Sequence, residues 1–238
     1  MKKIVFSFLC MLILGFPSCI KEGDNVTNYP PMVGVVGSLH SSMQPTIITE
    51  RGTVLAPELM EHLFLDLFEG DAIVVSFSVD YDNQPSTEYS TVSNLLYEKV
   101  GKVTSVPTPG GESESGDFSL PIEDVEPYFL LENTLFIFFA HTAPSDQKFK
   151  YEMTYYRDED AEIPTICLRA KKEGTGSKTE ATISYLYAFD MRYFFMTYKD
   201  SENYVTFNIN YKTGENEDGT DKYDIWTDNG NPFKIKIE

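Results

Sequence analysis

The fold of this chain is decided at residues 73–81, which read Ile-Val-Val-Ser-Phe-Ser-Val-Asp-Tyr. From Val75 onward, every second residue is apolar, and the residues between are two serines and one aspartate. Successive side chains of a β-strand point to opposite faces, so this alternation predicts a strand with one buried face and one polar face.

The segments on either side of this strand complete a domain predicted over residues 32–106. Strands are predicted at 33–39, 45–49, 52–56, 73–81 and 92–106. A helix is predicted at 57–68, because Pro57 suits the first helical position and Gly70 follows its end. Five strands with one helix between the third and the fourth are typical of an OB-type barrel.

A change of composition marks the end of this domain. Residues 107–117 read Pro-Thr-Pro-Gly-Gly-Glu-Ser-Glu-Ser-Gly-Asp and contain no large apolar side chain. Such a segment cannot contribute to a core and is rich in turn-forming residues. It is therefore predicted to be the linker between two domains.

Strand patterns dominate the second domain, which is predicted over residues 118–238. Strands are predicted at 128–131, 134–141, 148–157, 164–171, 179–189, 191–199, 204–211 and 233–237, with turns at 174–176 and 214–219. About eight short strands with one polar face predict an antiparallel β-sandwich of about 120 residues. The predicted fold class is thus all-β: an OB-like barrel with one short helix, followed by an antiparallel β-sandwich.

The N-terminus carries an export signal, predicted at residues 1–18. Lys2 and Lys3 precede an uncharged, mainly apolar run from Ile4 to Phe16, which is too short to span a bilayer as a permanent helix. Pro17-Ser18-Cys19 follows and resembles a bacterial lipobox. We therefore expect Cys19 to be lipidated and to become the mature N-terminus, so that the lipid anchors the protein to a membrane.

Residues 19–31 are predicted to be a tether. Ile20 to Asn25 is short, polar and acidic, and resembles the signal after the cysteine that sends lipoproteins of Bacteroidetes to the outer face of the outer membrane. Tyr29-Pro30-Pro31 favours an extended chain. The expected location is the outer membrane, with the protein exposed at the cell surface.

The charge of the chain excludes one class of partner. The sequence holds 19 basic and 37 acidic residues, a net charge of −18, and removal of Lys2 and Lys3 leaves 17 basic residues and a charge of −20. A surface of this sign repels phosphate backbones, so nucleic-acid binding is not expected.

Cysteine usage excludes an intramolecular disulfide in the mature chain. Cys10 leaves with the signal and Cys19 is acylated, so Cys167 is alone. Cys167 shares a predicted strand face with Thr165 and Arg169, and we expect it to be partly accessible without being activated.

The domain plan resembles that of the NigD-like lipoproteins of Bacteroidetes. Residues 69–77, Glu-Gly-Asp-Ala-Ile-Val-Val-Ser-Phe, are similar to the fourth OB strand of that family. Residues 131–137, Leu-Glu-Asn-Thr-Leu-Phe-Ile, and residues 149–155 are similar to the start of its sandwich. The resemblance covers most of the mature chain. It implies the fold and an envelope location, but no activity and no functional residues.

No metal or cofactor site is predicted. His40, His62 and His141 are far apart, and Glu58 and His62 share a helix face without a third ligand at a recognisable spacing. Residues 214–224 resemble a calcium loop, but the positions that need carboxylates at its ends are Gly214 and Ile225. The run of acids within 157–162 is typical of an exposed turn.

No catalytic residues are predicted either. Ser38 and His40 lie on one strand face without a triad motif, and Gly34 and Gly37 are interpreted as a bulge rather than a phosphate loop. Four tyrosines remain as candidates for a recognition surface: Tyr185, Tyr187, Tyr193 and Tyr198. Packing in the core is the alternative for them.

Three functions stay open. The first is a non-enzymatic binding or interaction module at the cell surface, with a protein or glycan ligand. The second is a structural or accessory subunit of an outer-membrane complex, and the third is a carboxylate-dependent hydrolase. An exposed aromatic patch would favour the first, a bare sheet edge the second, and a polar cluster in one cleft the third.

Overall fold

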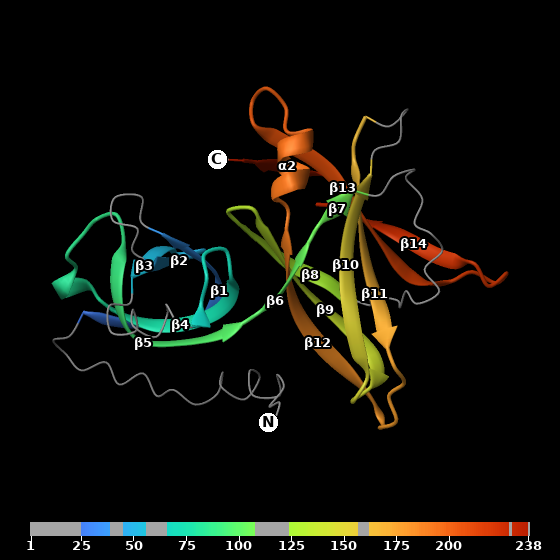
Figure 1. Cartoon of the computed structure of the whole chain (residues 1–238), viewed down its shortest axis with the longest axis horizontal. Helices are drawn as coiled ribbons and strands as arrows, with labels where there is room; N and C mark the ends of the chain where they lie inside the picture. The colour runs from blue at the N-terminus through green and yellow to red at the C-terminus, as the bar shows by residue number, and fades with distance from the viewer. Residues whose placement is uncertain are drawn as a thin grey trace.

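The computed structural model describes residues 25–38, 45–55, 66–107, 124–156, 162–228 and 230–237. The signal peptide, Cys19, most of the predicted helix at 57–68 and nearly all of the linker at 107–117 lie outside these residues, and so do His40 and His62. Figure 1 shows two units, a small barrel at the left and a larger sandwich at the right, joined by β6.

The first unit is a closed barrel in the order β1-β2-β3-β5-β4. Its strands are β1 (Val26–Ser38), β2 (Pro45–Thr49), β3 (Gly52–Leu55), β4 (Ala72–Asp80) and β5 (Ser90–Lys99). All pairs are antiparallel except β3 and β5. Ile73, Val75, Phe77 and Val79 are buried in the barrel core, as the alternation predicts. This order confirms the OB-type layout.

The barrel begins earlier than the sequence predicts. Residues 26–31 were expected in the tether, but they form the first half of β1 and pair with β4. The register shifts between Tyr29 and Met32, where Pro30 and Pro31 interrupt the regular pairing. The ring of Tyr29 lies 5.1 Å from that of Phe77, so this segment belongs to the folded unit.

The strand predicted at 92–106 is divided between the two units. Barrel strand β5 ends at Lys99, and β6 (Gly101–Thr104) and β7 (Val106–Pro107) follow. β6 pairs in parallel with β12 and β7 in parallel with β10, so both belong to the sandwich. The pairing therefore passes from the barrel to the sandwich at Val100, before the Gly- and Pro-rich segment.

The sandwich has two sheets. One has the order β6-β12-β9-β8, with β12 (Glu180–Asp190), β9 (Thr134–Pro144) and β8 (Asp124–Leu131). The other has the order β14-β13-β11-β10-β7, with β14 (Asp221–Trp226), β13 (Tyr204–Glu215), β11 (Thr165–Glu173) and β10 (Lys148–Tyr156); β15 (Phe233–Lys236) also pairs with β13. The pairs β6–β12, β7–β10 and β11–β13 are parallel, so the sandwich is mixed rather than purely antiparallel.

The strand predicted at 191–199 is wrong, because these residues form helix α2 (Arg192–Tyr198). Met191, Phe194 and Phe195 are buried, and Tyr198 packs against the same core. These positions follow the spacing i, i+3, i+4 and i+7 of a helix face. Among the residues that the structure describes, no helix is long and apolar enough to cross a membrane.

The two units share an apolar contact. Val33, Val35 and Ala72 from the barrel cluster with three sandwich residues, Phe136, Leu186 and Ala188. Lys102 of β6 adds a hydrogen bond to the carbonyl oxygen of Gly70, at 2.6 Å. The barrel thus packs against the outer face of the β6-β12-β9-β8 sheet.

Candidate functional site

One side of the sandwich is open because the chain changes sheets there. β6 pairs with β12 only at residues 187–190, and β7 pairs with β10 only at Thr154 and Tyr155. Beyond this crossing, toward the first residues of β10 and β12, no strand in the described part of the chain pairs with that edge of either sheet. In Figure 1 the crossing is seen as the green ribbon that runs from β6 up to β7.

A groove of about 570 Å³ lies along β10 at this open side. Its apolar wall consists of Val103 and Val106 from the crossing segment, and of Phe149, Tyr151, Met153 and Tyr187. Val106 is the most accessible of them, with 49% of its surface exposed. The groove therefore combines strongly packed rings with one exposed aliphatic side chain at its rim.

The aromatic wall is built by close ring packing. The ring centroids of Tyr151 and Tyr187 lie 4.2 Å apart, and Phe139 lies behind Tyr151 at 4.6 Å. Gly101 lets the ring of Tyr187 lie against the backbone of β6, because a Cβ atom there would be 3.0 Å from Tyr187 Cε1. Burial raises the pKa of the Tyr151 and Tyr187 phenols, so both hydroxyls stay protonated and neutral.

The charged side chains that line the groove are Lys102, Lys150, Glu152 and Glu173, two of each sign. Glu152 accepts a hydrogen bond from Lys171 at 2.8 Å and from Lys150 at 3.0 Å. Burial favours the neutral carboxyl, but these two lysines outweigh it and lower the pKa of Glu152. At the barrel end, Lys102 lies 4.0 Å from Asp190. A carboxylate held ionised by two lysines is suited to an ion pair rather than to proton donation.

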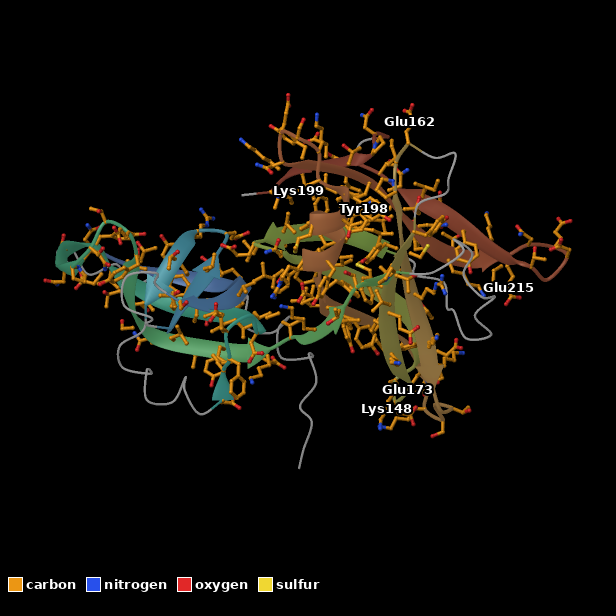
Figure 2. The ribbon with its side chains drawn as sticks, turned by 45° about the horizontal axis from the view of Figure 1, so that its top comes forward. Lys148, Glu162, Glu173, Tyr198, Lys199 and Glu215 are labelled. Carbon is orange, nitrogen blue, oxygen red and sulfur yellow. The ribbon has the colours of Figure 1, made fainter. Side chains whose placement is uncertain are left out.

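The four tyrosines named from the sequence do not form one surface. Tyr187 lines the groove, and Tyr185 packs beside Tyr151 in the sandwich core. Tyr198 packs on Phe194 at a centroid distance of 5.0 Å, whereas Tyr193 is 63% exposed on α2. Figure 2 shows Tyr198 on α2, well away from Lys148 and Glu173 at the far end of the β10–β11 hairpin. Core packing is therefore confirmed for Tyr185 and Tyr198.

The expected accessibility of Cys167 is wrong. The residue is buried, with 7% of its surface exposed. Burial raises the pKa of its thiol, although the guanidinium of Arg169 opposes this rise. The alternation along β11 does place Thr165, Cys167 and Arg169 on one face, but that face is largely covered rather than open.

The calcium-like segment forms a hairpin turn. Gly214 is part of β13, and Gly219 adopts a positive φ of 80°. Asp218 accepts hydrogen bonds from the backbone N–H and the hydroxyl of Thr220, so it closes the turn with its own neighbours. Among the described residues, no three histidine, cysteine, aspartate or glutamate side chains are grouped as metal ligands would be.

Gly34 and Gly37 mark close packing rather than a bulge. A Cβ atom at Gly34 would lie 2.9 Å from Ile47 Cγ2, and one at Gly37 would lie 2.9 Å from Ile48 Cδ1. The two glycines therefore let β1 and β2 pack tightly in the barrel. His141 is placed in β9, where it pairs with Ile183.

Sequence reasoning missed most of the groove. The sequence places Lys102, Val103 and Val106 in the barrel domain. In the structure these three residues line the groove of the sandwich. Their position depends on parallel pairing with strands about 50 to 85 residues later in the chain, which leaves no local pattern. The signal that could have drawn attention to them is Gly101, which interrupts the predicted long strand.

The sequence matches no protein-family model and no curated protein. The fold, by contrast, is similar to several solved structures. An uncharacterized protein from Parabacteroides merdae has a TM-score of 0.69 and 16% identity, over 87% of this chain and 99% of that chain.

Two further structures match the sequence-based resemblance. A candidate lipoprotein from Bacteroides fragilis has a TM-score of 0.58 and 15% identity, over 89% of this chain and 99% of the other. A NigD-like immunity protein from Bacteroides caccae has a TM-score of 0.53 and 14% identity, over 89% of this chain and 98% of the other. The predicted resemblance is thus confirmed in structure: this chain has the fold of a NigD-like immunity protein.

Proposed function

We propose that this chain is a non-enzymatic binding protein of the outer-membrane surface, anchored by a lipid at Cys19. The observation that supports binding is the groove along β10, where aromatic side chains and paired charges lie at the open side of the sandwich. Grooves with an apolar wall and a few fixed polar groups are suited to ligand recognition. The fold shared with a lipoprotein candidate supports the anchored location.

The fold shared with an immunity protein is also in keeping with binding. Protection by occupation of a target requires a recognition surface and no reacting group. The ionisable groups of the groove support the same conclusion, because two lysines keep Glu152 ionised and both tyrosine hydroxyls remain protonated.

A second candidate function is that of an accessory subunit in an envelope complex. It is favoured by the edge of β10, which no described strand covers between Phe149 and Met153. Open sheet edges recruit partner strands. The two candidates therefore point to the same side of the sandwich, and they differ in whether the partner is a transient ligand or a permanent neighbour.

The anchor is tested by replacing Cys19. The full chain is expressed in its native envelope with a clickable fatty acid, and we expect the label on the wild-type protein and none on Cys19→Ala. Cys167→Ser is the control and should keep the label. Labelling of Cys19→Ala at the wild-type level would contradict the lipobox interpretation.

The groove is tested by photo-crosslinking in the same envelope. A photoreactive amino acid replaces Thr104, which is exposed at the groove, or Thr220, which is exposed in the β13–β14 turn. We expect a discrete adduct from position 104 and none from position 220.

Two matched substitutions then ask whether the adduct depends on the groove. Val106→Lys places a charge at the rim, and Ile225→Lys makes the same change at another exposed aliphatic residue, outside the groove. Only Val106→Lys should abolish the adduct. Equal yields of the adduct in the two lysine variants would contradict binding at the groove. So would the absence of an adduct from position 104 when neither lysine substitution is present.

A further inference from the structure

We infer that the groove takes an uncharged segment of a partner protein, which places an aliphatic side chain against Val103, Val106 and Tyr187. This inference rests on the proposed function, since it names the chemistry of the ligand that the groove binds. It is supported by the balance of charges in the groove, by the aliphatic surface at its opening and by hydroxyl groups that have no hydrogen-bond partner among the described residues.

The groove is neutral although the chain as a whole is strongly acidic. Its charged side chains are Lys102, Lys150, Glu152 and Glu173, two of each sign, whereas the sequence holds 19 basic and 37 acidic residues. Glu173 is exposed and lies opposite Lys148 in the pairing of β10 with β11, as Figure 2 shows at the far end of these strands. A charged ligand would therefore meet no excess of the opposite charge.

The charges of the groove are also engaged within the fold. Glu152 accepts hydrogen bonds from Lys150 and Lys171. Lys102 lies 4.0 Å from a carboxylate oxygen of Asp190. A charged ligand would have to separate one of these pairs, or lose its own hydration without gaining a partner, and both cost free energy. An uncharged ligand bears neither cost.

The apolar surface that a ligand can reach in the groove is mainly aliphatic. Val106 is 49% exposed and Val103 is half-buried, whereas Tyr151 and Met153 are buried. Tyr187 is half-buried, and its ring packs against that of Tyr151. A sugar stacks on an open, flat aromatic face, whereas these rings are packed against one another. An aliphatic side chain fits better, because contact with the two valines removes apolar surface from water.

Two hydroxyl groups of the groove indicate that the ligand carries peptide groups. The structure gives the Tyr187 hydroxyl no hydrogen bond to a described residue, and burial keeps it protonated. Thr154 Oγ1 is buried and has no hydrogen-bond partner among the described residues. Buried polar groups are nearly always hydrogen-bonded, so each of these hydroxyls is suited to a group that the ligand brings. Peptide groups supply both kinds, since a carbonyl oxygen accepts from Tyr187 and an N–H donates to Thr154 once its side chain turns to the groove.

The position of the groove favours a segment of a larger partner over a free small molecule. Small ligands bury roughly 70–90% of their surface in the pockets that bind them. This groove lies at the open side of the sandwich, where no strand in the described ranges pairs with the edge of β10 between residues 149 and 153. A side chain carried by a partner protein can enter such a groove while the rest of the partner covers its open side.

The test uses the full chain and a series of small probes that share one side chain. N-acetyl-leucine N-methylamide is uncharged and has a peptide group on each side of its Cα atom. N-acetyl-leucine is the anionic counterpart, and leucine N-methylamide is the cationic one. Binding is measured near physiological salt by NMR of labelled valine methyl groups. Val26, which is 46% exposed on the barrel, is the internal reference for Val106.

We expect the uncharged probe at millimolar concentration to shift the methyl signals of Val103 and Val106 and to leave those of Val26 unchanged. Both charged probes should bind at least about threefold more weakly, because each brings a charge for which the groove has no free partner. N-acetylglycine N-methylamide, which lacks the side chain, and methyl glucoside, a sugar, should leave all these signals unchanged.

Removal of one hydroxyl tests the role of the peptide groups. Tyr187→Phe keeps the ring and should weaken binding of the uncharged probe about two- to tenfold, the usual effect of one neutral hydrogen bond. Tyr193→Phe, at an exposed tyrosine of α2, is the matched control and should leave the affinity unchanged. Equal affinities in the two variants would contradict a bond from the Tyr187 hydroxyl.

Removal of one charge tests the balance. Glu152→Gln leaves Lys150 and Lys171 without their shared carboxylate, so the anionic probe should then bind at least as tightly as the uncharged one. Glu217→Gln, at an exposed turn residue, should keep the preference for the uncharged probe. A preference that Glu152→Gln leaves unchanged would mean that charge balance does not select the ligand.

The outcomes separate this inference from the proposed function. Tighter binding of a charged probe, equal binding of the glycine analogue, the same shifts with methyl glucoside, or no shift with the uncharged probe overturns the inferred ligand. If the adduct from position 104 is nevertheless found in the envelope, the groove still binds and only the inferred chemistry is wrong. Loss of that adduct overturns the proposed function together with the inference.

Discussion

At the scale of single residues, the thiol of Cys167 is buried because of where β11 places it. Burial raises the pKa of Cys167, so little thiolate is present near neutral pH. We expect iodoacetamide at pH 8 to modify Cys167 in the folded chain at least tenfold more slowly than in denaturant, measured by mass spectrometry of its peptide. Thr220→Cys, in an exposed turn, provides the reference and should react at the rate of a free thiol. A folded Cys167 that reacts as fast would contradict its burial.

Asp146 shows how an exposed carboxylate can be structural. It accepts hydrogen bonds from the backbone N–H of Lys178 and from the N–H and hydroxyl of Ser177, at 2.9 to 3.0 Å, and thereby ties the β9–β10 turn to the segment before β12. The bond from Lys178 is the largest cause that lowers the pKa of Asp146 in the folded chain. Its three partners therefore favour the ionised form over the protonated one.

The stability of the chain should depend on this charge in a defined pH range. A pKa that is lower in the folded state stabilises the fold above the unfolded pKa of 3.8, and this contribution is lost as the pH falls through the folded value. Asp146→Asn should lower the melting temperature at pH 7, and the difference should shrink below pH 3.8. Glu217→Gln, at an exposed turn residue, should show neither effect. A pH-independent difference would mean that the charge is not the cause.

At the scale of elements, the alternating pattern predicts strands well where one face is buried and the other is wet. β4 and β10 follow it closely, since Phe149, Tyr151, Met153 and Tyr155 are all buried. The same logic failed at 191–199, where aromatic residues were interpreted as a strand although Met191, Phe194, Phe195 and Tyr198 have helical spacing. A short apolar run fits both the two-residue period of a strand and the 3.6-residue period of a helix, and tertiary packing decides between them.

Helix α2 can be tested by two neighbouring substitutions. Phe194 is fully buried and lies 5.2 Å from Tyr155 and 5.5 Å from Phe207, measured between ring centroids. Phe194→Ala should lower the free energy of unfolding by about 3–5 kcal/mol, the usual cost of a cavity of this size. Tyr193→Ala, on the exposed face, should change it by less than about 0.5 kcal/mol. Urea denaturation measures both, and similar losses would contradict the placement of the helix.

The candidate site was predicted only in part, for a reason that lies in its elements. Tyr187 could be named because aromatic residues stand out in the sequence. Val103 and Val106 could not, since their neighbours are set by parallel pairing with β12 and β10, far along the chain. The open edge of β10 was equally hidden, because a sequence pattern reports which face is buried and not which strand stands beside it.

At the scale of the whole molecule, the barrel and the sandwich are held together by a hydrogen bond from Lys102 to Gly70, by apolar packing and by the course of the chain. They share the apolar cluster that includes Val35, Phe136 and Leu186. The chain also runs from β5 directly into β6 and β7, which pair with the two sheets of the sandwich. The OB-type order was predictable from five strands and one helix. The exchange of residues 101–107 into the second unit was not, because the Gly- and Pro-rich segment follows rather than precedes them.

This connection determines what a cut in the predicted linker should do. With a specific protease site inserted between Gly111 and Glu112, cleavage leaves β6 and β7 on the N-terminal piece, while β10 and β12 remain on the C-terminal piece. The pairs β6–β12 and β7–β10, together with the shared apolar cluster, should hold the pieces together. We therefore expect the cut protein to elute as one species in gel filtration and to separate only in denaturant. Uncut protein is the control for elution volume. Two species that separate without denaturant would place the boundary between the units at the linker, as composition alone predicts, and would contradict the pairing of 101–107 with the sandwich.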